Sequence, residues 1–204
     1  MATTDTDLVT RMKRTLSLEG EEVGKLADSI DFDQLSRFVD IIAAGKGNLL
    51  LTACGTSAMA AKKAMHTLNV IGVPAFFLSP SDATNGALGA VRKDDVVVYV
   101  SKGGTTAELL SFLPNLKEKG CTIVTVTEKT ESPLAKAADL VVRVHVEAES
   151  DRFNMLATAS TLAVIATFDA AAIALMERGR FSKEQFLENH PSGDVGDRLK
   201  DGRA

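Results

Sequence analysis

Two short loops rich in glycine and hydroxyl side chains could bind an anion. The first is Ala53-Cys-Gly-Thr-Ser57, and the second is Ser101-Lys-Gly-Gly-Thr-Thr106. Glycine lets backbone N–H groups approach an anion closely, hydroxyl groups can donate hydrogen bonds to its oxygens, and Lys102 adds a full positive charge. Ser and Thr are also ordinary helix N-caps, so each loop taken alone has a structural explanation as well. Two such loops, each between a predicted strand and a predicted helix, favour an anion site.

Neither loop has the pattern of a nucleotide-binding motif. A Walker A loop needs GxxxxGK[ST], which the sequence lacks. A dinucleotide fingerprint needs GxGxxG after the first strand, whereas Gly45-Lys-Gly47 comes before that strand. The expected anion is therefore a small phosphate rather than ATP or NAD, and no cofactor is expected.

Five short runs rich in Val, Ile and Leu are predicted to be strands, and helical patterns separate them. They lie at about 48–52, 74–78, 95–100, 122–126 and 140–144. Nearly continuous apolar strands that alternate with helices indicate a parallel sheet covered on both faces, which is an α/β fold of three layers. Ligands bind at the carboxyl ends of the strands in such sheets, and both loops begin there.

The rest of the chain is predicted to be helical. Asp31 is the expected N-cap of a second N-terminal helix, and Ser182 with Gln185 forms a capping box. Helices are expected within 4–44, at 56–68, from the second loop to about 119, and at 132–138, 155–178 and 182–189. The tail from Pro191 onward is expected to be mobile. We interpret 1–204 as a single domain, with N-terminal helices at about 4–44, an α/β core at 45–180, and a C-terminal helix and tail at 181–204.

Composition excludes several classes of protein. The 204 residues are 45% hydrophobic and carry a net charge of -4, which argues against a nucleic-acid partner. Cys54 and Cys121 suit neither a disulfide framework nor a zinc site, and no metal cluster is expected. The N-terminus carries acidic residues and lacks an apolar stretch, so it does not resemble a signal peptide. Thr, Ser and Asp residues interrupt the apolar stretch 155–176. A cytoplasmic protein without a membrane span is therefore expected.

The two loops resemble those of the sugar isomerase (SIS) family, whose fold is flavodoxin- or Rossmann-like. The second loop is similar to the family's phosphate loop, SxSGxT, with Gly103 at the position of the second serine. The resemblance implies a phosphorylated sugar as ligand. It implies phosphate contacts from the second loop and sugar contacts from the first, with the residues Ser101, Lys102, Gly103, Thr105, Thr106, Gly55, Thr56 and Ser57.

From about Gly45 to Leu199 the chain is similar to the SIS domain of arabinose-5-phosphate isomerases. The similar segments include 80–89, Glu149 with Thr158-Ala-Ser-Thr161, and His190-Pro-Ser-Gly193, which resembles that family's HPGG. In that family the HPGG segment precedes a pair of CBS regulatory modules. This sequence stops about a dozen residues later, so we expect the modules to be missing.

The resemblance implies an aldose–ketose isomerase that works through an enediol, with Glu149 and His190 as catalytic residues. We expect partial burial to raise the pKa of Glu149 toward neutrality, as suits a base. Glu147 and Asp151 are alternatives to Glu149 in the same loop. A C-terminal histidine of this family commonly reaches a neighbouring subunit's pocket, which implies a homo-oligomer, either dimer or tetramer, with shared sites.

Other polar residues have weaker assignments. Asp82 and Asn85 are possible substrate contacts but need no role beyond turn formation. Thr158, with Ser160 and Thr161, is a further possible contact at the start of the long helix. His66, in the first crossover helix, and His145, assigned to the fifth strand, are expected to be structural.

Two departures from the isomerase pattern leave alternatives open. Thr56 replaces a lysine of the first loop, and Thr105 replaces a glutamate of the phosphate loop. These losses favour a non-catalytic phosphosugar sensor as a second hypothesis. A third is another phosphosugar enzyme, such as a lyase or a heptose- or hexulose-phosphate isomerase.

Overall fold

A five-stranded parallel sheet forms the centre of the molecule, as predicted. In the computed structural model, which describes residues 5–200, the strand order is β2-β1-β3-β4-β5 and every pair is parallel. The strands are β1 Leu49–Ala53, β2 Ala75–Phe77, β3 Val96–Val100, β4 Thr122–Thr127 and β5 Leu140–Arg143. The fifth strand ends two residues before His145, so the assignment of His145 to that strand was wrong.

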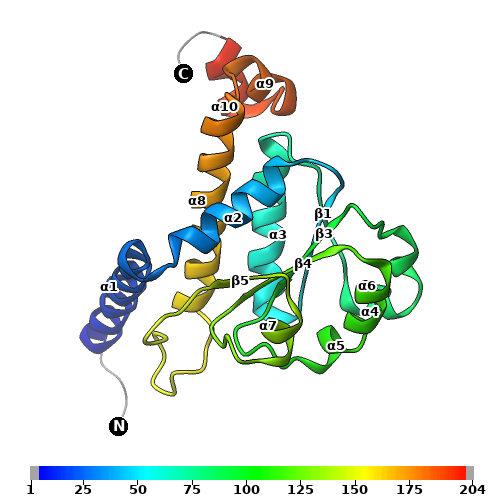
Figure 1. Cartoon of the computed structure of the whole chain (residues 1–204). Coiled ribbons are helices and arrows are strands. Elements are labelled where there is room, and N and C mark those ends of the chain that lie inside the picture. Colours follow the sequence, from blue (N-terminus) through cyan, green and yellow to red (C-terminus); the bar gives the residue numbers. More distant parts are fainter. Residues whose placement is uncertain (1–4, 201–204) are drawn as a thin grey trace.

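The described residues form ten α-helices, several of which cover the two faces of the sheet (Figure 1). They are α1 Asp5–Ser29, α2 Phe32–Ala43, α3 Gly55–Val70, α4 Pro80–Thr84, α5 Ala107–Leu110, α6 Leu113–Lys119, α7 Pro133–Ala137, α8 Ala159–Gly179, α9 Lys183–Asn189 and α10 Gly193–Lys200. A 3-10 helix, η1, covers Ala87–Ala90. Asp31 caps α2 and Ser182 caps α9 in a capping box, as predicted.

The alternation of side chains along the strands divides the core into two layers. On β3, Val98 and Val100 face one core with α2, α3 and α8, whereas Val97 and Tyr99 face a second core with α5, α6 and α7. Side chains alternate between the two faces of a strand, so both faces of this sheet are buried under helices.

Three helix predictions needed correction. The helix expected from the second loop to about 119 is broken into α5 and α6, because Pro114 lies in the first turn of α6 and cannot continue a preceding helix. The alanine-rich helix begins at Ala159 rather than 155. The tail from Pro191, expected to be mobile, contains the helix α10, and Lys200 Nζ donates to the Pro191 carbonyl at 2.8 Å.

The long helix α8 lies along α1, α2 and α3 (Figure 1). By length and composition alone it could cross a membrane. Small residues such as Ala163, Ala171 and Ala172 are buried, while Leu162 and Ile173 remain exposed. One side of α8 is therefore packed inside the protein, and another is exposed.

Candidate functional site

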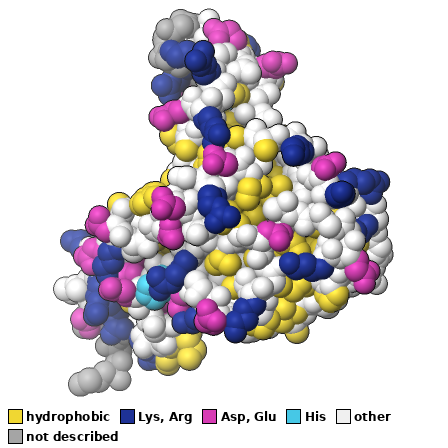
Figure 2. Space-filling model, viewed as in Figure 1, with side chains coloured by type: hydrophobic (Ala, Val, Ile, Leu, Met, Phe, Trp, Pro, Cys, Tyr) yellow, Lys and Arg dark blue, Asp and Glu magenta, His cyan; other side chains and the backbone are white. Residues whose placement is uncertain are grey.

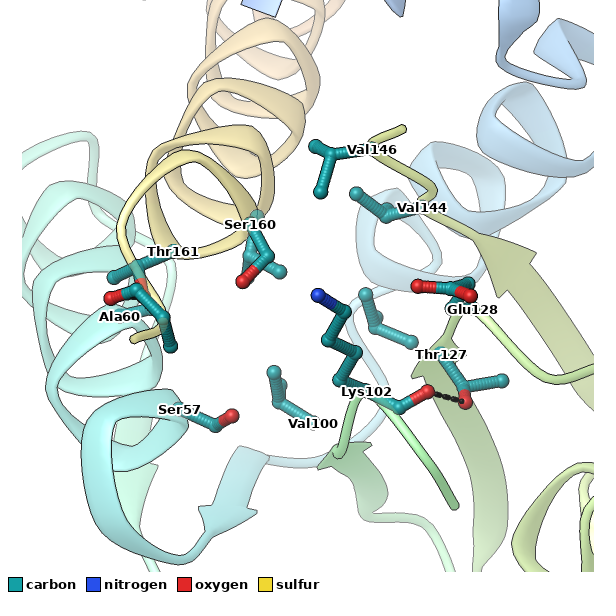
Figure 3. Close-up of a pocket in the computed structure, with 13 residues that line it drawn as sticks. Ser57, Ala60, Val100, Lys102, Thr127, Glu128, Val144, Val146, Ser160 and Thr161 are labelled. Atoms are coloured by element: carbon teal, nitrogen blue, oxygen red, sulfur yellow. Dashed lines mark hydrogen bonds between the residues drawn. The ribbon is translucent and has the colours of Figure 1, made fainter. Parts of the chain in front are cut away.

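A small cavity lies where the strands end and the loops begin. The register pairs Ala53 with Val100 and Val100 with Val126, so the loops after β1, β3 and β4 leave the sheet at the same level. The cavity has a volume of about 50 Å³. Its polar lining residues come from α3, the loop after β3, the end of β4 and the residue after it, and the start of α8 (Figure 3). They are Ser57, Lys102, Thr127, Glu128, Ser160 and Thr161.

The second loop is held in one conformation by its own hydroxyls and by the neighbouring loop. Ser101 Oγ lies 3.1 Å from Thr106 Oγ1 and accepts the Gly104 N–H at 3.2 Å. Thr127 Oγ1 donates to the Lys102 carbonyl at 3.0 Å. Thr106, the N-cap of α5, makes no side-chain capping bond to that helix among the described residues. Its hydroxyl therefore serves the loop rather than an ordinary helix cap.

The first loop opens the longer helix α3. Cys54 is the N-cap residue and gives no side-chain capping bond among the described residues. Gly55 and Thr56 are exposed, whereas Ser57 lines the cavity. Free N–H groups at the start of a helix carry partial positive charge, so this end of α3 suits a negatively charged ligand.

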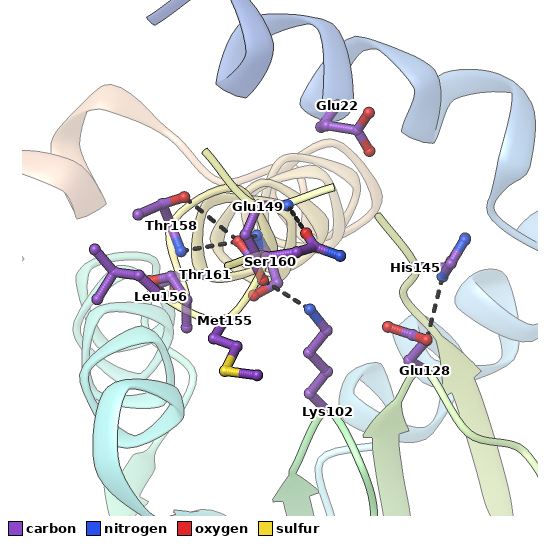
Figure 4. Close-up of polar contacts among 12 residues, drawn as sticks. Glu22, Lys102, Glu128, His145, Glu149, Met155, Leu156, Thr158, Ser160 and Thr161 are labelled. Carbon is purple, nitrogen blue, oxygen red and sulfur yellow. Dashed lines mark hydrogen bonds and ion pairs between the residues drawn. The ribbon is translucent and has the colours of Figure 1, made fainter. Parts of the chain in front are cut away.

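An ion pair joins the second loop to the loop before α8 (Figure 4). Lys102 Nζ lies 2.7 Å from Glu149 Oε1. The other oxygen, Glu149 Oε2, accepts the N–H groups of Thr158 at 3.0 Å and Ser160 at 3.2 Å. The Glu149 side chain is 2% exposed and the Lys102 side chain 45%. The carboxylate therefore also caps the start of α8.

These contacts reverse the expected direction of the Glu149 pKa. Burial by itself raises the pKa of this carboxyl group, but the hydrogen bonds from Lys102, Ser160 and Thr158 outweigh it and hold the pKa below its ordinary value. The expectation of a raised pKa was therefore wrong for the structure as it stands. That expectation took account of the burial of Glu149 but not of the Lys102 ammonium group and the backbone N–H groups that contact its carboxylate.

The alternative carboxylates have other partners. Glu147 is largely exposed and pairs with Lys25 at 2.6 Å. Asp151 accepts the N–H groups of Phe153, Met155 and Leu156, and these bonds, which outweigh the effect of burial, lower its pKa. Asp151 thus organises residues 151–156 as a turn, which explains why α8 begins later than predicted.

The remaining predicted contacts do not line the cavity. Asp82 and Asn85 are exposed on and after α4, where the Asn85 amide donates to the Ser81 carbonyl at 2.7 Å. Thr105 is exposed on the second loop. Thr158 Oγ1 accepts the Ser150 N–H at 3.2 Å, so its hydroxyl helps to shape the loop before α8.

His190 lies at the opposite end of the molecule from the cavity. It follows α9, and its ring centroid is 5.9 Å from that of Phe186. Asn189 beside it bonds the carbonyl of Val70, at the far end of α3 from Ser57. Figure 1 shows α9 beyond the C-terminal end of α8. The cavity is lined by Ser160 and Thr161, at the N-terminal end of α8. Within one chain, His190 and Glu149 are not brought together.

Glu128 is a cavity residue that the sequence analysis overlooked. It follows directly after β4, with a side chain that is 10% exposed, and His145 lies beside it (Figure 4). The rule that located the two loops, a polar residue at the carboxyl end of a strand, would also have indicated Glu128.

A larger cavity, of about 620 Å³, lies at the amino ends of the strands, opposite the ends where the two loops begin. Main chain of 45–49 and 71–74 contributes much of its lining. Arg178 on its wall is paired with Asp40. Ligands of parallel α/β sheets bind at the carboxyl ends of the strands, so the smaller cavity is the candidate site.

The family model for the SIS domain matches residues 42–174, which includes both loops, the cavity and most of α8. The chain belongs to the SIS-domain family. Within that family, it is 38% identical over 193 residues to arabinose 5-phosphate isomerase KdsD of Pseudomonas aeruginosa, covering 95% of this chain and 59% of the relative. It is 35% identical to arabinose 5-phosphate isomerase KpsF of Escherichia coli, covering 97% of this chain and 62% of the relative. The chain thus spans about three fifths of the length of these SIS-domain relatives.

Two solved structures have the same fold over nearly the whole chain. A putative sugar-phosphate isomerase from Listeria monocytogenes is 42% identical, with a TM-score of 0.91 and coverage of 94% of this chain and 100% of that one. A protein of E. coli CFT073 in complex with arabinose 5-phosphate is 32% identical, with a TM-score of 0.88 and coverage of 92% and 100%.

Proposed function

We propose that this chain isomerises a pentose phosphate between its aldose and ketose forms, with arabinose 5-phosphate and ribulose 5-phosphate as the pair. The observation that carries the proposal is the buried Glu149, paired at 2.7 Å with a lysine of the phosphate loop where the strands end. The relatives named arabinose 5-phosphate isomerases and the neighbour in complex with arabinose 5-phosphate support this substrate class.

The phosphate is expected to bind the second loop. Ser101, Gly103, Thr105 and Thr106 would provide hydroxyls and backbone N–H groups, and Lys102 would provide charge. Gly55, Thr56 and Ser57 would line the sugar side. Lys102 lines the cavity, and we expect its side chain to turn toward the phosphate when the sugar phosphate binds.

Movement of Lys102 would also activate Glu149. A phosphate dianion competes with Glu149 for the ammonium group, and an exposed lysine can turn toward it. Once Lys102 has left, the buried carboxylate loses its nearest cation and its pKa rises. Glu149 can then remove the proton from the sugar carbon next to the carbonyl and return it to the neighbouring carbon through an enediol. Binding of the correct charged group would thus prepare the base.

We further propose a homo-oligomer in which His190 of one copy completes the site of another. His190 is remote from the cavity of its own chain, and exposed apolar residues offer a surface for a second copy. They lie on α1, before α8 and on α8: Leu8, Val9, Met12, Leu16, Phe153, Met155, Leu156, Leu162 and Ile173. On the face shown in Figure 2, hydrophobic side chains are grouped across the middle of the molecule, whereas charged side chains cover most of the lower left, where α1 lies. We also propose that 1–204 forms one domain in the cytoplasm.

The test is isomerisation together with solvent deuterium exchange at the sugar carbons, measured on pentose, hexose and heptose phosphates.

Ser101→Ala and Thr106→Ala are each expected to weaken phosphosugar binding by about 1–3 kcal/mol, because each removes a hydrogen bond to a charged group. Glu149→Gln is expected to retain binding and lose turnover. If both Ser101→Ala and Thr106→Ala bind the sugar phosphate with unchanged affinity, the second loop does not bind the phosphate.

A non-catalytic phosphosugar sensor is the second candidate. The observation that favours it is the presence of Thr56 and Thr105 where the similar isomerases carry a lysine and a glutamate. Binding of a sugar phosphate without any carbon-bound deuterium exchange would establish the sensor and exclude the isomerase.

A further inference from the structure

Glu128 is a second carboxylate at the cavity, besides Glu149. The two carboxylates lie on different sides of the Lys102 side chain (Figure 4). Glu128 follows β4, and its side chain is 10% exposed. It lines the cavity together with Lys102, Ser160 and Thr161, and Figure 3 shows its carboxylate end directed toward the Lys102 ammonium group. Glu149 is not among the lining residues, because Lys102 and the start of α8 cover it.

The two carboxylates differ in which oxygens are occupied. Both oxygens of Glu149 accept hydrogen bonds, as described above. Glu128 Oε1 accepts Lys129 Nζ at 2.6 Å, whereas Oε2 accepts no hydrogen bond from residues 5–200. Glu128 therefore keeps one free acceptor oxygen next to the space where a sugar would lie.

His145 lies behind Glu128 with an unused nitrogen. Its Nδ1 is buried, lacks a hydrogen-bond partner within the described chain, and lies 3.5 Å from Glu128 Oε1. Buried polar atoms are nearly always hydrogen-bonded, so a buried His145 Nδ1 without a hydrogen bond, 3.5 Å from Glu128 Oε1, needs an explanation. A shift of a few tenths of an ångström would close a hydrogen bond to Oε1 and leave Oε2 directed at the cavity.

We propose that Glu128 is a second acid–base residue of the site and that His145 is its positioning residue. The inference rests on the proposed isomerase function. Isomerisation moves two protons, one between carbons and one between oxygens. In this proposal Glu149 transfers the proton between C2 and C1, and Glu128 transfers the hydroxyl proton from O2 to O1.

The step balances without a co-reactant. The Glu128 carboxylate takes the proton of the O2 hydroxyl, and Glu149 takes the proton of C2. The electron pair of the broken C2–H bond forms the C1=C2 bond, and the C1=O π pair moves to O1, which receives the proton from Glu128. In the second half, the O2 electron pair forms C2=O while the C1=C2 pair takes the proton from Glu149 at C1. Both carboxylates end ionised, as they began.

The test compares Glu128→Gln with Glu131→Gln in the full chain, using arabinose 5-phosphate as the probe. Glu131 follows in the same loop with a side chain that is 86% exposed. We expect Glu128→Gln to lower kcat by about 10²- to 10⁴-fold with KM unchanged, which is the usual contribution of one acid–base group. Glu131→Gln should match the unaltered protein. Glu128→Asp, which retains a carboxylate, should recover part of the loss.

His145 is tested with a pair of variants. Asn places a donor near the position of Nδ1, so His145→Asn should retain most of kcat, whereas His145→Leu should lower it with KM unchanged. Equal losses in the two variants would overturn the positioning role.

The outcomes separate the two proposals. If the unaltered protein turns over and Glu128→Gln retains full kcat, the role of Glu128 is overturned while the isomerase stands. If the unaltered protein neither isomerises nor exchanges any sugar phosphate, the proposed function fails and this inference fails with it.

Discussion

The Lys102–Glu149 ion pair connects the second loop to the start of α8 through two side chains. One partner is buried and receives two backbone N–H groups in addition to the ammonium group. Burial and hydrogen bonding act on the pKa in opposite directions, and here the hydrogen bonds prevail. The same carboxylate therefore stabilises the fold of the ligand-free protein and, in the proposed mechanism, becomes the base.

The pH dependence of stability should reveal this role. The folded pKa of Glu149 lies below its ordinary value of 4.5, so its contribution is present above about pH 4.5 and is lost as the pH falls through the folded pKa. Glu149→Gln should lower the free energy of unfolding by about 1–3 kcal/mol at about pH 7, with a smaller difference in acid. Urea unfolding at several pH values measures the free energy of unfolding of Glu149→Gln and of the unaltered protein, and Glu131→Gln is the control. A difference that does not depend on pH would contradict the assignment.

At the scale of elements, the second loop, residues 101–106, takes its shape from its neighbours. Gly104 has a φ of +64° and packs against Ser132, the N-cap of α7, while Leu134 N–H donates to the Gly104 carbonyl at 3.2 Å. The loop after β3 and the start of α7 are therefore built as one unit. Gly103 beside it has more room, because a methyl group added there would meet only Thr105 Oγ1, at 3.7 Å.

Adjacent glycines of this loop should respond differently to alanine. A methyl group at Gly104 would overlap Ser132 Oγ and occupy an unfavourable positive φ. We expect Gly104→Ala to destabilise the protein by about 2–4 kcal/mol, since steric overlap and backbone strain add. Gly103→Ala should change stability by less than about 1 kcal/mol. Thermal or urea unfolding of the two variants provides the comparison, and equal effects would show that the loop is not packed as described.

At the scale of the whole molecule, α8 separates two regions that the proposed chemistry requires together. The cavity and Glu149 lie at its N-terminal end, while α9 and His190 lie beyond its C-terminal end (Figure 1). Helices α1 and α8 carry exposed apolar side chains, among them Leu16, which is 71% exposed. A second copy could cover these faces and bring its own His190 to the site.

Complementation between inactive variants tests a shared site. Glu149→Gln and His190→Gln should each be inactive alone. When they are co-expressed in equal amounts, half of randomly formed dimers are mixed, and each has one intact site. Activity should therefore return to about a quarter of the unaltered level, because the symmetric interface places each histidine in the other subunit's site. No recovery in proven mixed oligomers would exclude the exchange of His190.

The strand pattern, the caps at Asp31 and Ser182 and the two polar loops could all be predicted from the sequence, because each depends on residues close together in the chain. Periodicity, propensity and capping are local, and the rule that ligands bind at strand ends indicated where the candidate site lies. Tertiary packing alone decided which side chains meet there. It paired Lys102 with Glu149, 47 residues apart, lowered a pKa that burial alone would raise, brought Glu128 and His145 together, and separated His190 from its own cavity. These outcomes depend on distances between segments remote in sequence, which no local pattern records.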